Sequence, residues 1–245
     1  PLALAVDPLD GSSNIDTNLS IGTIFSLLPV TEADPHGLSS FLQPGGNQVG
    51  AGFFIYGPQL ALALTLGRGT HIFVYSPRLE AFVQAYADVS IPASTQEFAI
   101  NASNYRHWDE AMRIYTDDLL RGATGPRGKD FNMRWTASPV ADIYRILTRG
   151  GVFLYPGDLR EGYACGRLRL VYEANPLAWI VEQAGGGASN GYRRTLDLVP
   201  TGLHQRTPFT CGSRSEVEYI MRLNREPHGL GEHSPLFTKR GLFRT

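Results

Sequence analysis

Residues 7–16 place two carboxylates three residues apart directly after an apolar run at residues 2–6, which predicts a strand with acidic side chains at its exit. The segment reads Asp-Pro-Leu-Asp-Gly-Ser-Ser-Asn-Ile-Asp. Mg²⁺ prefers carboxylate and carbonyl oxygens, and it commonly bridges from one or two protein carboxylates to a substrate phosphate. Gly11 permits close approach of the backbone, and amides at a turn or helix start direct partial positive charge at an anion. The segment therefore predicts a joint site for divalent metal and phosphate.

The alternative is that this segment has only a structural role, because Asp-Pro and Asp-Gly are common turn formers and Ser-Ser-Asn can cap a helix.

Composition narrows the class of protein. The 245 residues, 42% hydrophobic and 18% charged, suit one globular unit of one or two domains. A net charge of −1 provides no basic field for nucleic acid, and no stretch approaches the roughly 20 apolar residues that a membrane helix needs. Cys165 and Cys211 are far apart and outside any metal or nucleophile pattern, so we expect buried free thiols. With no signal-like N-terminus, this favours the cytoplasm and a small-molecule partner.

The order of predicted elements changes along the chain. Antiparallel strands are expected at residues 2–6, 20–30, 59–66, 70–76 and 79–86. Residues 49–56 fit a helix or a strand by periodicity. Beyond a junction near residue 96, helices alternate with strands, which indicates an α/β layer. The helices are expected at 107–121, 139–148, 175–184 with Asn175 as its cap, and 216–224, and the strands at 151–155, 168–172 and 208–212.

Two segments carry a family resemblance. Residues 7–16, followed by Ser-Ile-Gly-Thr-Ile-Phe at 20–25, resemble the signature of metal-dependent sugar phosphatases related to inositol monophosphatase, and specifically that of class I fructose-1,6-bisphosphatase. Residues 166–176, Gly-Arg-Leu-Arg-Leu-Val-Tyr-Glu-Ala-Asn-Pro, resemble the family segment Gly-Lys-Leu-Arg-Leu-Leu-Tyr-Glu-Cys-Asn-Pro. The resemblance favours a helix at 49–56.

The resemblance also implies an α/β fold, a layered α-β-α-β-α sandwich that here lacks its N-terminal part. Residues 1–96 would be the remainder of the N-terminal metal- and phosphate-binding domain, 97–225 the C-terminal sugar-phosphate domain, and 226–245 a tail. The residues of the site follow from the matched motifs. The carboxylates of Asp7, Asp10 and Glu173 and the carbonyl of Leu9 are implied as ligands of two or three Mg²⁺ ions, with Mn²⁺ as a possible substitute.

Glu173 also has support from its place in the chain. A carboxylate at the end of an apolar strand, just ahead of a helix start, lies where α/β proteins bind ligands. The alternative is that Glu173 simply pairs with Arg169. The reacting phosphate is expected on the backbone amides of Gly11, Ser12 and Ser13.

The second phosphate of the substrate is expected on a group of residues matched to family segments. Three of the segments depart from the family pattern: Ala-Ser replaces Glu-Gly at 102–103, Trp135 replaces a tyrosine, and Arg167 replaces a lysine. Since the chain has 20 Arg and only two Lys, we interpret the change at 167 as compositional. The carried-over contacts are Asn101, Tyr105, Tyr155, Arg167, Trp135 and, reaching into a neighbouring subunit's site, Arg134.

The activity implied is hydrolysis of the 1-phosphate of fructose 1,6-bisphosphate to fructose 6-phosphate by a homotetramer. Sedoheptulose 1,7-bisphosphatase, alone or as a second activity, is the nearest alternative, and an inactive fragment acting as a binding module is another. An inositol or nucleotide phosphatase is disfavoured because residues for a second phosphate are present. In the family, further acidic ligands lie upstream of residue 7, so we expect this chain alone to have little phosphatase activity and weak metal binding.

Overall fold

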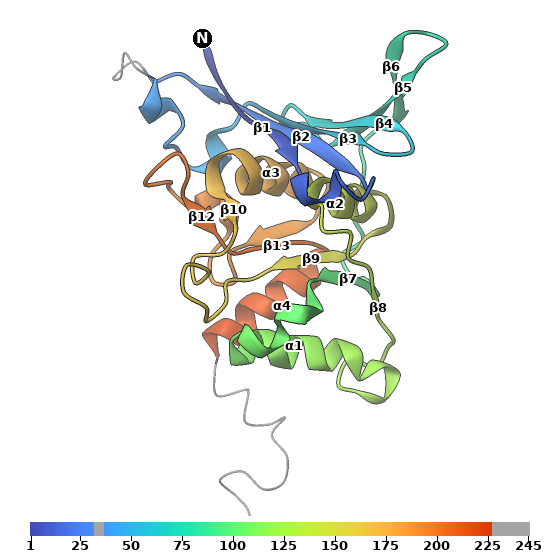
Figure 1. Ribbon diagram of the computed structural model, residues 1–245, viewed down its shortest axis with the longest axis vertical. Coiled ribbons are helices and arrows are strands. Elements are labelled where there is room, and N and C mark those ends of the chain that lie inside the picture. The colour runs from blue at the N-terminus through green and yellow to red at the C-terminus, as the bar shows by residue number, and fades with distance from the viewer. Residues whose placement is uncertain (32–36, 227–245) are drawn as a thin grey trace, which may run out of the picture.

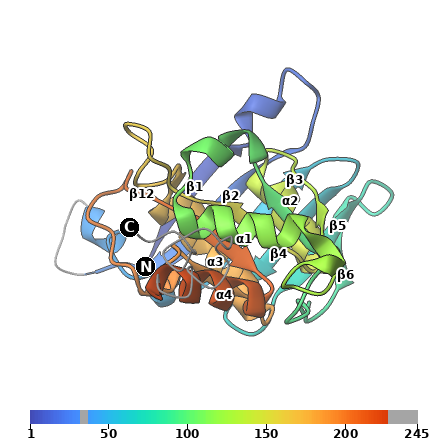
Figure 2. The ribbon, with the colours of Figure 1, turned by 90° about the horizontal axis from the view of Figure 1, so that it is seen from below.

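The computed structural model describes residues 1–31 and 37–226. Four layers are stacked in it: a six-stranded sheet, a pair of helices, a five-stranded sheet and a second pair of helices (Figure 1). The helices are α1 (Glu110–Leu120), α2 (Pro139–Arg149), α3 (Asn175–Gln183) and α4 (Arg214–Arg225). Helices α2 and α3 lie between the sheets, and α1 and α4 lie side by side over the far face of the second sheet (Figure 2). The predicted layered α/β fold is confirmed.

The first sheet is an antiparallel meander in chain order. Its strands are β1 (Leu2–Asp10), β2 (Ile21–Pro29), β3 (Gly50–Tyr56), β4 (Leu60–Thr65), β5 (His71–Ser76) and β6 (Ala81–Tyr86). Side chains alternate between the two faces of a strand, and one face of the sheet packs on α2 and α3. Ile24, Phe53 and Ile72 are fully buried on that face. The strands expected in this half of the chain are confirmed.

The helix favoured for residues 49–56 is wrong, because these residues form the strand β3. β3 pairs with β2 on one side and β4 on the other, so both of its backbone edges are used in the sheet. Glycine is a poor helix former, and Gly52 has a packing role in the strand. A Cβ there would lie 2.4 Å from the ring of Phe25 and 2.9 Å from the carbonyl oxygen of Ala63.

The second sheet has the order β11-β13-β9-β7-β8. Its strands are β7 (Glu97–Ile100), β8 (Asn132–Met133), β9 (Val152–Tyr155), β11 (Gly187–Ser189) and β13 (Phe209–Gly212). β7 and β9 run parallel at its centre and are buried throughout apart from Tyr155 at the end of β9. The predicted domain junction near residue 96 lies between β6 and β7 and stays a prediction.

Three elements begin or end elsewhere than expected. The helix expected from residue 107 begins at Glu110, because Asp109 accepts a hydrogen bond from the amide of Met112 and caps it. The strand expected over 168–172 contains only Leu168–Arg169 (β10), which pairs with β12 (Arg206–Thr207).

From Leu170 to Ala174 the chain forms a π-helical turn that continues into α3. Asn175 is therefore already inside the helix and does not cap it. The remaining expected helices and strands are confirmed to within a few residues. Residues 227–245 of the expected tail lie outside the described residues. Within 1–31 and 37–226, none of the helices has the length and apolar character needed to cross a membrane.

Candidate active site

Asp7 and Asp10 point to the same side of β1 because a β-bulge separates them. Residues three apart in a regular strand point to opposite faces. Asp7 lies opposite Ile24 and Asp10 opposite Gly22, so three steps along β1 match two along β2. The extra residue turns Asp10 inward, where it is buried beside the half-buried Asp7.

The N-terminus of helix α2 holds the Asp10 carboxylate. The amide of Val140, in the first turn of α2, donates to Oδ2 of Asp10 at 3.0 Å, and the Ser138 hydroxyl lies 3.4 Å from the same oxygen. The unpaired amides and the dipole of a helix N-terminus favour such an anion. Gly22 makes the approach possible, since a Cβ there would lie 2.1 Å from the carbonyl oxygen of Phe54 and 2.7 Å from the Val140 side chain.

Glu173 reaches the same place from the other half of the chain. It lies in the π-helical turn between β10 and α3, and its Oε2 accepts a hydrogen bond from the backbone amide of Arg169 at 2.6 Å. Single π-helical turns are frequent at functional sites. The Arg169 guanidinium instead donates to the carbonyl of Arg167. Among the described residues, Glu173 forms no ion pair with the Arg169 side chain. The alternative, in which Glu173 merely pairs with Arg169, is therefore not supported.

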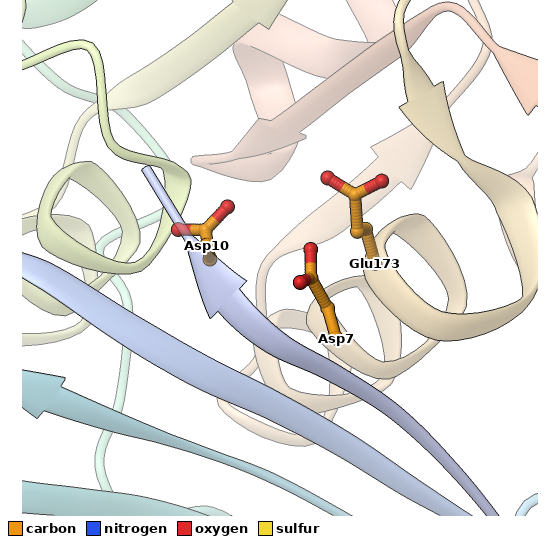
Figure 3. A group of neighbouring side chains, drawn as sticks. All are labelled: Asp7, Asp10 and Glu173. Carbon is orange, nitrogen blue, oxygen red and sulfur yellow. The ribbon is translucent and has the colours of Figure 1, made fainter. Parts of the chain in front are cut away.

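The three carboxylates converge. One oxygen of each of Asp7, Asp10 and Glu173 lies within 4.8 Å of the others, and Figure 3 shows the Asp7 and Glu173 side chains on facing elements with Asp10 beside them. Burial raises the pKa of Asp10 to about 7, with a smaller contribution from the charge of Asp7. Burial likewise raises the pKa of Glu173 to about 8, assisted by the charges of Asp7 and Asp10.

Both pKa values are raised because the carboxylates are buried and lie close to one another. Three oxygen donors at such separations match the preference of Mg²⁺ and Mn²⁺ for hard oxygen ligands. A divalent ion among them would offset both their burial and their repulsion. The residues therefore fit a divalent metal.

A cavity of about 610 Å³ opens beside the acidic cluster. Leu9, whose backbone carbonyl is an expected metal ligand, lines this cavity together with Gly11 and Ser12. Ser13 does not line it. Gly11 has φ +75°, a left-handed conformation that favours glycine, and it starts the 3-10 turn Ser12–Asn14. The Asn14 side chain anchors this turn by donating to the carbonyl of Thr136 at 2.9 Å.

A second, small pocket lies at the carboxyl ends of two parallel strands. Ile100 of β7 lies beside Leu154 of β9, so the next residues, Asn101 and Tyr155, emerge side by side. Arg167 joins them from the chain just before β10, and all three line this pocket. Ligands in open α/β sheets commonly bind outside the carboxyl ends of strands.

The other residues expected around the second phosphate lie elsewhere. The hydroxyl of Tyr105 donates to the carboxylate of Asp117 at 3.0 Å, and this half-exposed tyrosine does not line the pocket. Trp135 stacks on Phe153, with 5.8 Å between ring centroids, and meets the edge of Tyr155.

Arg134 lies on the surface near the edge of the second sheet. Its side chain is 48% exposed, and its Nε lies 3.1 Å from Glu97. Its backbone amide donates to the carbonyl of Phe98 in β7. Arg134 therefore does not line the pocket that Asn101 shares with Arg167.

Three residues of the cavity wall escaped the sequence analysis as site residues. Arg169, Tyr172 and His204 all line the large cavity, and the Tyr172 hydroxyl lies 2.8 Å from Nδ1 of His204. Arg169 and Tyr172 flank Glu173 within the matched segment 166–176, which was a usable signal. His204 approaches only because β12 pairs with β10, and its own sequence neighbourhood did not reveal this.

Comparison with known proteins agrees with the matched segments. Residues 2–87 match the family model of the fructose-1-6-bisphosphatase N-terminal domain, and residues 91–225 match that of the C-terminal domain. The chain is 63% identical over 246 residues to a class 1 fructose-1,6-bisphosphatase of Sinorhizobium medicae, covering 99% of this chain and 70% of that protein. A Rhodopseudomonas palustris protein of the same name is 51% identical over 244 residues, covering 100% of this chain and 70% of the relative.

Solved structures give the same result for the fold. The crystal structure of Leishmania major fructose-1,6-bisphosphatase in its T-state superposes with a TM-score of 0.86 and 36% identity, over 92% of this chain and 70% of that one. The holo form of the same enzyme gives 0.85. The resemblance found in the sequence is confirmed, and the chain belongs to the class 1 fructose-1,6-bisphosphatase family of hydrolases.

Proposed function

We propose that the protein hydrolyses the 1-phosphate of fructose 1,6-bisphosphate, with Mg²⁺ as cofactor, to give fructose 6-phosphate and phosphate. The observation that carries this proposal is the convergence of Asp7, Asp10 and Glu173 beside a large cavity. The names of the relatives support the choice of substrate.

Asp7, Asp10, Glu173 and the carbonyl of Leu9 are assigned to hold two or three Mg²⁺ ions. Bound Mg²⁺ supplies Lewis-acid polarisation of the phosphate and stabilises charge on the leaving oxygen. The chain's own contribution is to fix the ligands before substrate arrives. Backbone amides hold one oxygen of Asp10 and one of Glu173, so the positions of these carboxylates are set by α2 and the π-helical turn.

The amides of Gly11, Ser12 and Ser13 are assigned to the reacting phosphate. Amides at a turn of this kind can take up charge that develops on the equatorial oxygens of the phosphoryl group. The left-handed conformation of Gly11 and the anchoring of Asn14 support this assignment, because both hold the turn in place.

Asn101, Tyr155 and Arg167 are assigned to the second phosphate, with Trp135 supporting Tyr155 and with Tyr105 at the margin of the site. Binding energy from a remote phosphate orients the sugar and so accelerates reaction at the other end. The Tyr105 hydroxyl can bind the phosphate only after it gives up its hydrogen bond to the Asp117 carboxylate.

We further propose a cytoplasmic homotetramer in which Arg134 serves the neighbouring copy. Its exposure, and its position away from the pocket that Asn101 and Arg167 share, support that assignment. Both cysteines are free, which supports a reducing compartment. Cys211 is buried as expected, but the expectation is wrong for Cys165, which is exposed.

The test is phosphate release by the intact protein from fructose 1,6-bisphosphate and from sedoheptulose 1,7-bisphosphate, with Mg²⁺ and with EDTA. We expect turnover of the fructose compound only with the metal, and kcat/KM at least about 10-fold higher than for the sedoheptulose compound. Asp10→Asn should abolish it, whereas Asp16→Asn, a change at an exposed acid of the same segment, should not. Turnover that survives EDTA, or that is absent from both substrates, contradicts the proposal.

A further inference from the structure

Arg167 stacks on aromatic rings and forms no ion pair with an acid among the described residues, although its charge helps Arg160 to lower the pKa of Asp158, which lines the same pocket. Its guanidinium carbon lies 4.1 Å from the centroid of the Tyr163 ring and 5.8 Å from that of Tyr155. Within residues 1–31 and 37–226 it forms no ion pair, and no hydrogen bond from its guanidinium is found. Stacking fixes the plane of a guanidinium while leaving its five N–H donors available.

The Tyr163 ring is itself held in place. The Arg160 guanidinium also lies over it, 4.9 Å from the centroid. Arg160 is fixed by the buried carboxylate of Asp158, with Nε to Oδ1 at 3.0 Å, and by Oδ1 of Asn104 at 3.0 Å. The hydrogen bond and charge of Arg160 lower the pKa of Asp158, so the acid stays ionised at neutral pH.

Backbone hydrogen bonds close the loop that carries this ring, residues 157–166. The amide of Gly166 donates to the carbonyl of Tyr163 at 2.9 Å, and the amide of Asp158 donates to the same carbonyl at 3.2 Å. The amide of Leu159 donates to the carbonyl of His107 at 2.9 Å, which ties the loop to the body of the protein. The ring of Tyr163 is therefore a fixed surface against which Arg167 can rest.

We propose that Tyr163 is a positioning residue for the second phosphate: its ring holds the Arg167 guanidinium in the plane from which it grips the phosphate beside Asn101. This inference rests on the proposed function, because it assigns the pocket to the phosphate that is not cleaved. The stack suits an arginine in particular, since a planar guanidinium stacks on an aromatic face and binds phosphate bidentately, whereas a lysine ammonium does neither. Arg167 and Tyr163 then form one unit.

The first experiment compares Tyr163→Leu, which removes the ring, with the matched control Tyr163→Phe, which keeps it. Among the described residues the Tyr163 hydroxyl makes no hydrogen bond, so the phenylalanine variant preserves every contact used here. We expect Tyr163→Leu to weaken binding of fructose 6-phosphate, measured by calorimetry, about 3- to 10-fold, and to raise KM for fructose 1,6-bisphosphate equally. Tyr163→Phe should remain within about twofold of the natural protein.

Fructose 1-phosphate, which lacks the second phosphate, separates positioning from general damage. Its turnover should be the same in Tyr163→Leu as in the natural protein, whereas a disordered site would slow it. The inference is overturned if Tyr163→Leu binds fructose 6-phosphate as tightly as the natural protein, if Tyr163→Phe loses as much as Tyr163→Leu, or if the natural protein does not bind fructose 6-phosphate.

Arg167→Lys supplies the second measurement. It should weaken binding of fructose 6-phosphate more in the natural protein than in Tyr163→Leu, because the ring that distinguishes the two cations is then gone. Equal losses in both backgrounds contradict the inference. If the proposed function is wrong, the natural protein will release no phosphate from fructose 1,6-bisphosphate. The calorimetric comparison measures binding of fructose 6-phosphate and does not depend on that release.

Discussion

The amide of Val140 donates to Oδ2 of Asp10 at 3.0 Å, so the first turn of helix α2 and the bulged end of strand β1 meet at one carboxylate oxygen. This contact joins segments 130 residues apart in the chain. The same carboxylate belongs to the acidic cluster, because one of its oxygens lies within 4.8 Å of an oxygen of Asp7 and of Glu173.

Replacing Asp10 with Asn should separate its structural role from its metal role. The amide oxygen can still accept the hydrogen bond from Val140, but the charge is lost. We expect the melting temperature of the metal-free protein at pH 7 to rise, because a neutral amide replaces a buried carboxylate whose ionisation costs stability. The activity should fall by about 100-fold or more, since even outer partners of metal ligands cost about 10- to 100-fold in affinity. An Asp10→Asn protein that keeps its activity would refute this assignment.

The acidic cluster should make the stability of the metal-free protein fall as pH rises. Asp10 and Glu173 have pKa values of about 7 and about 8 in the fold, and near 4 when unfolded, so the unfolded chain releases these protons first. The stabilisation that the fold gains from the protonated Asp10 and Glu173 carboxyls is complete below about pH 4 and is lost by about pH 8. Thermal melts in EDTA should show this decline, and the Asp10→Asn, Glu173→Gln double variant should show much less of it.

Metal binding should release protons near neutral pH. A ligand carboxyl must be ionised, so at pH 7 both groups lose protons when Mg²⁺ binds. Calorimetric titrations in two buffers of different ionisation enthalpy measure that release directly. We expect release at pH 7 and nearly none at pH 9, and equal apparent enthalpies in the two buffers at pH 7 would contradict the raised pKa values.

Ala137 has φ +59°, a left-handed conformation that costs a residue with a Cβ about 1–2 kcal/mol. It lies between Thr136, which anchors the turn of Asn14, and Ser138, which faces Asp10. Replacing Ala137 with Gly should therefore stabilise the fold by about 1 kcal/mol and raise the melting temperature by about 2–4 °C. A lower melting temperature would show that the alanine is not strained.

The pair formed by Arg127 and Glu216 should be a major stabilising contact away from the site. The two lie 2.6 Å apart, both are largely buried, and the guanidinium lies over the rings of Phe131 and Tyr219. Arg127→Leu should destabilise the fold by about 3 kcal/mol, because it leaves a buried carboxylate without its ionic partner, with the Tyr115 hydroxyl as its remaining hydrogen-bond donor. Adding Glu216→Gln should recover part of that loss in urea unfolding, and the absence of any recovery would count against this explanation.

The sequence predicted most of the strands and the identity of the acidic cluster, because these depend on local patterns. Apolar runs and turn residues defined β1, β2 and β4, and the two matched segments contained Asp7, Asp10 and Glu173. What it could not supply was the geometry that makes the cluster possible. The bulge between Asp7 and Asp10 depends on pairing with β2, and the π-helical turn of Glu173 depends on packing beside β1.

The wrong prediction of a helix at residues 49–56 has a physical origin. Their periodicity fits a helix or a strand, and the resemblance favoured the helix. Residues 50–56 became a strand because neighbours on both sides used their backbone hydrogen bonds. The interpretation of Arg167 as a compositional change stays a prediction, and the structure adds a stacking partner for it in Tyr163, four residues earlier in a loop without regular structure. Contacts formed by tertiary packing leave no local pattern to find.

The central claim, that Asp7, Asp10 and Glu173 act together as one divalent metal site, is tested most directly by metal titration. Binding of Mn²⁺ can be followed by electron paramagnetic resonance in the natural protein, in Glu173→Gln and in the control Glu182→Gln on helix α3. The account predicts that Glu173→Gln weakens binding about 10-fold or more while the control binds normally. Equal Mn²⁺ affinity in the natural protein and in Glu173→Gln would contradict it.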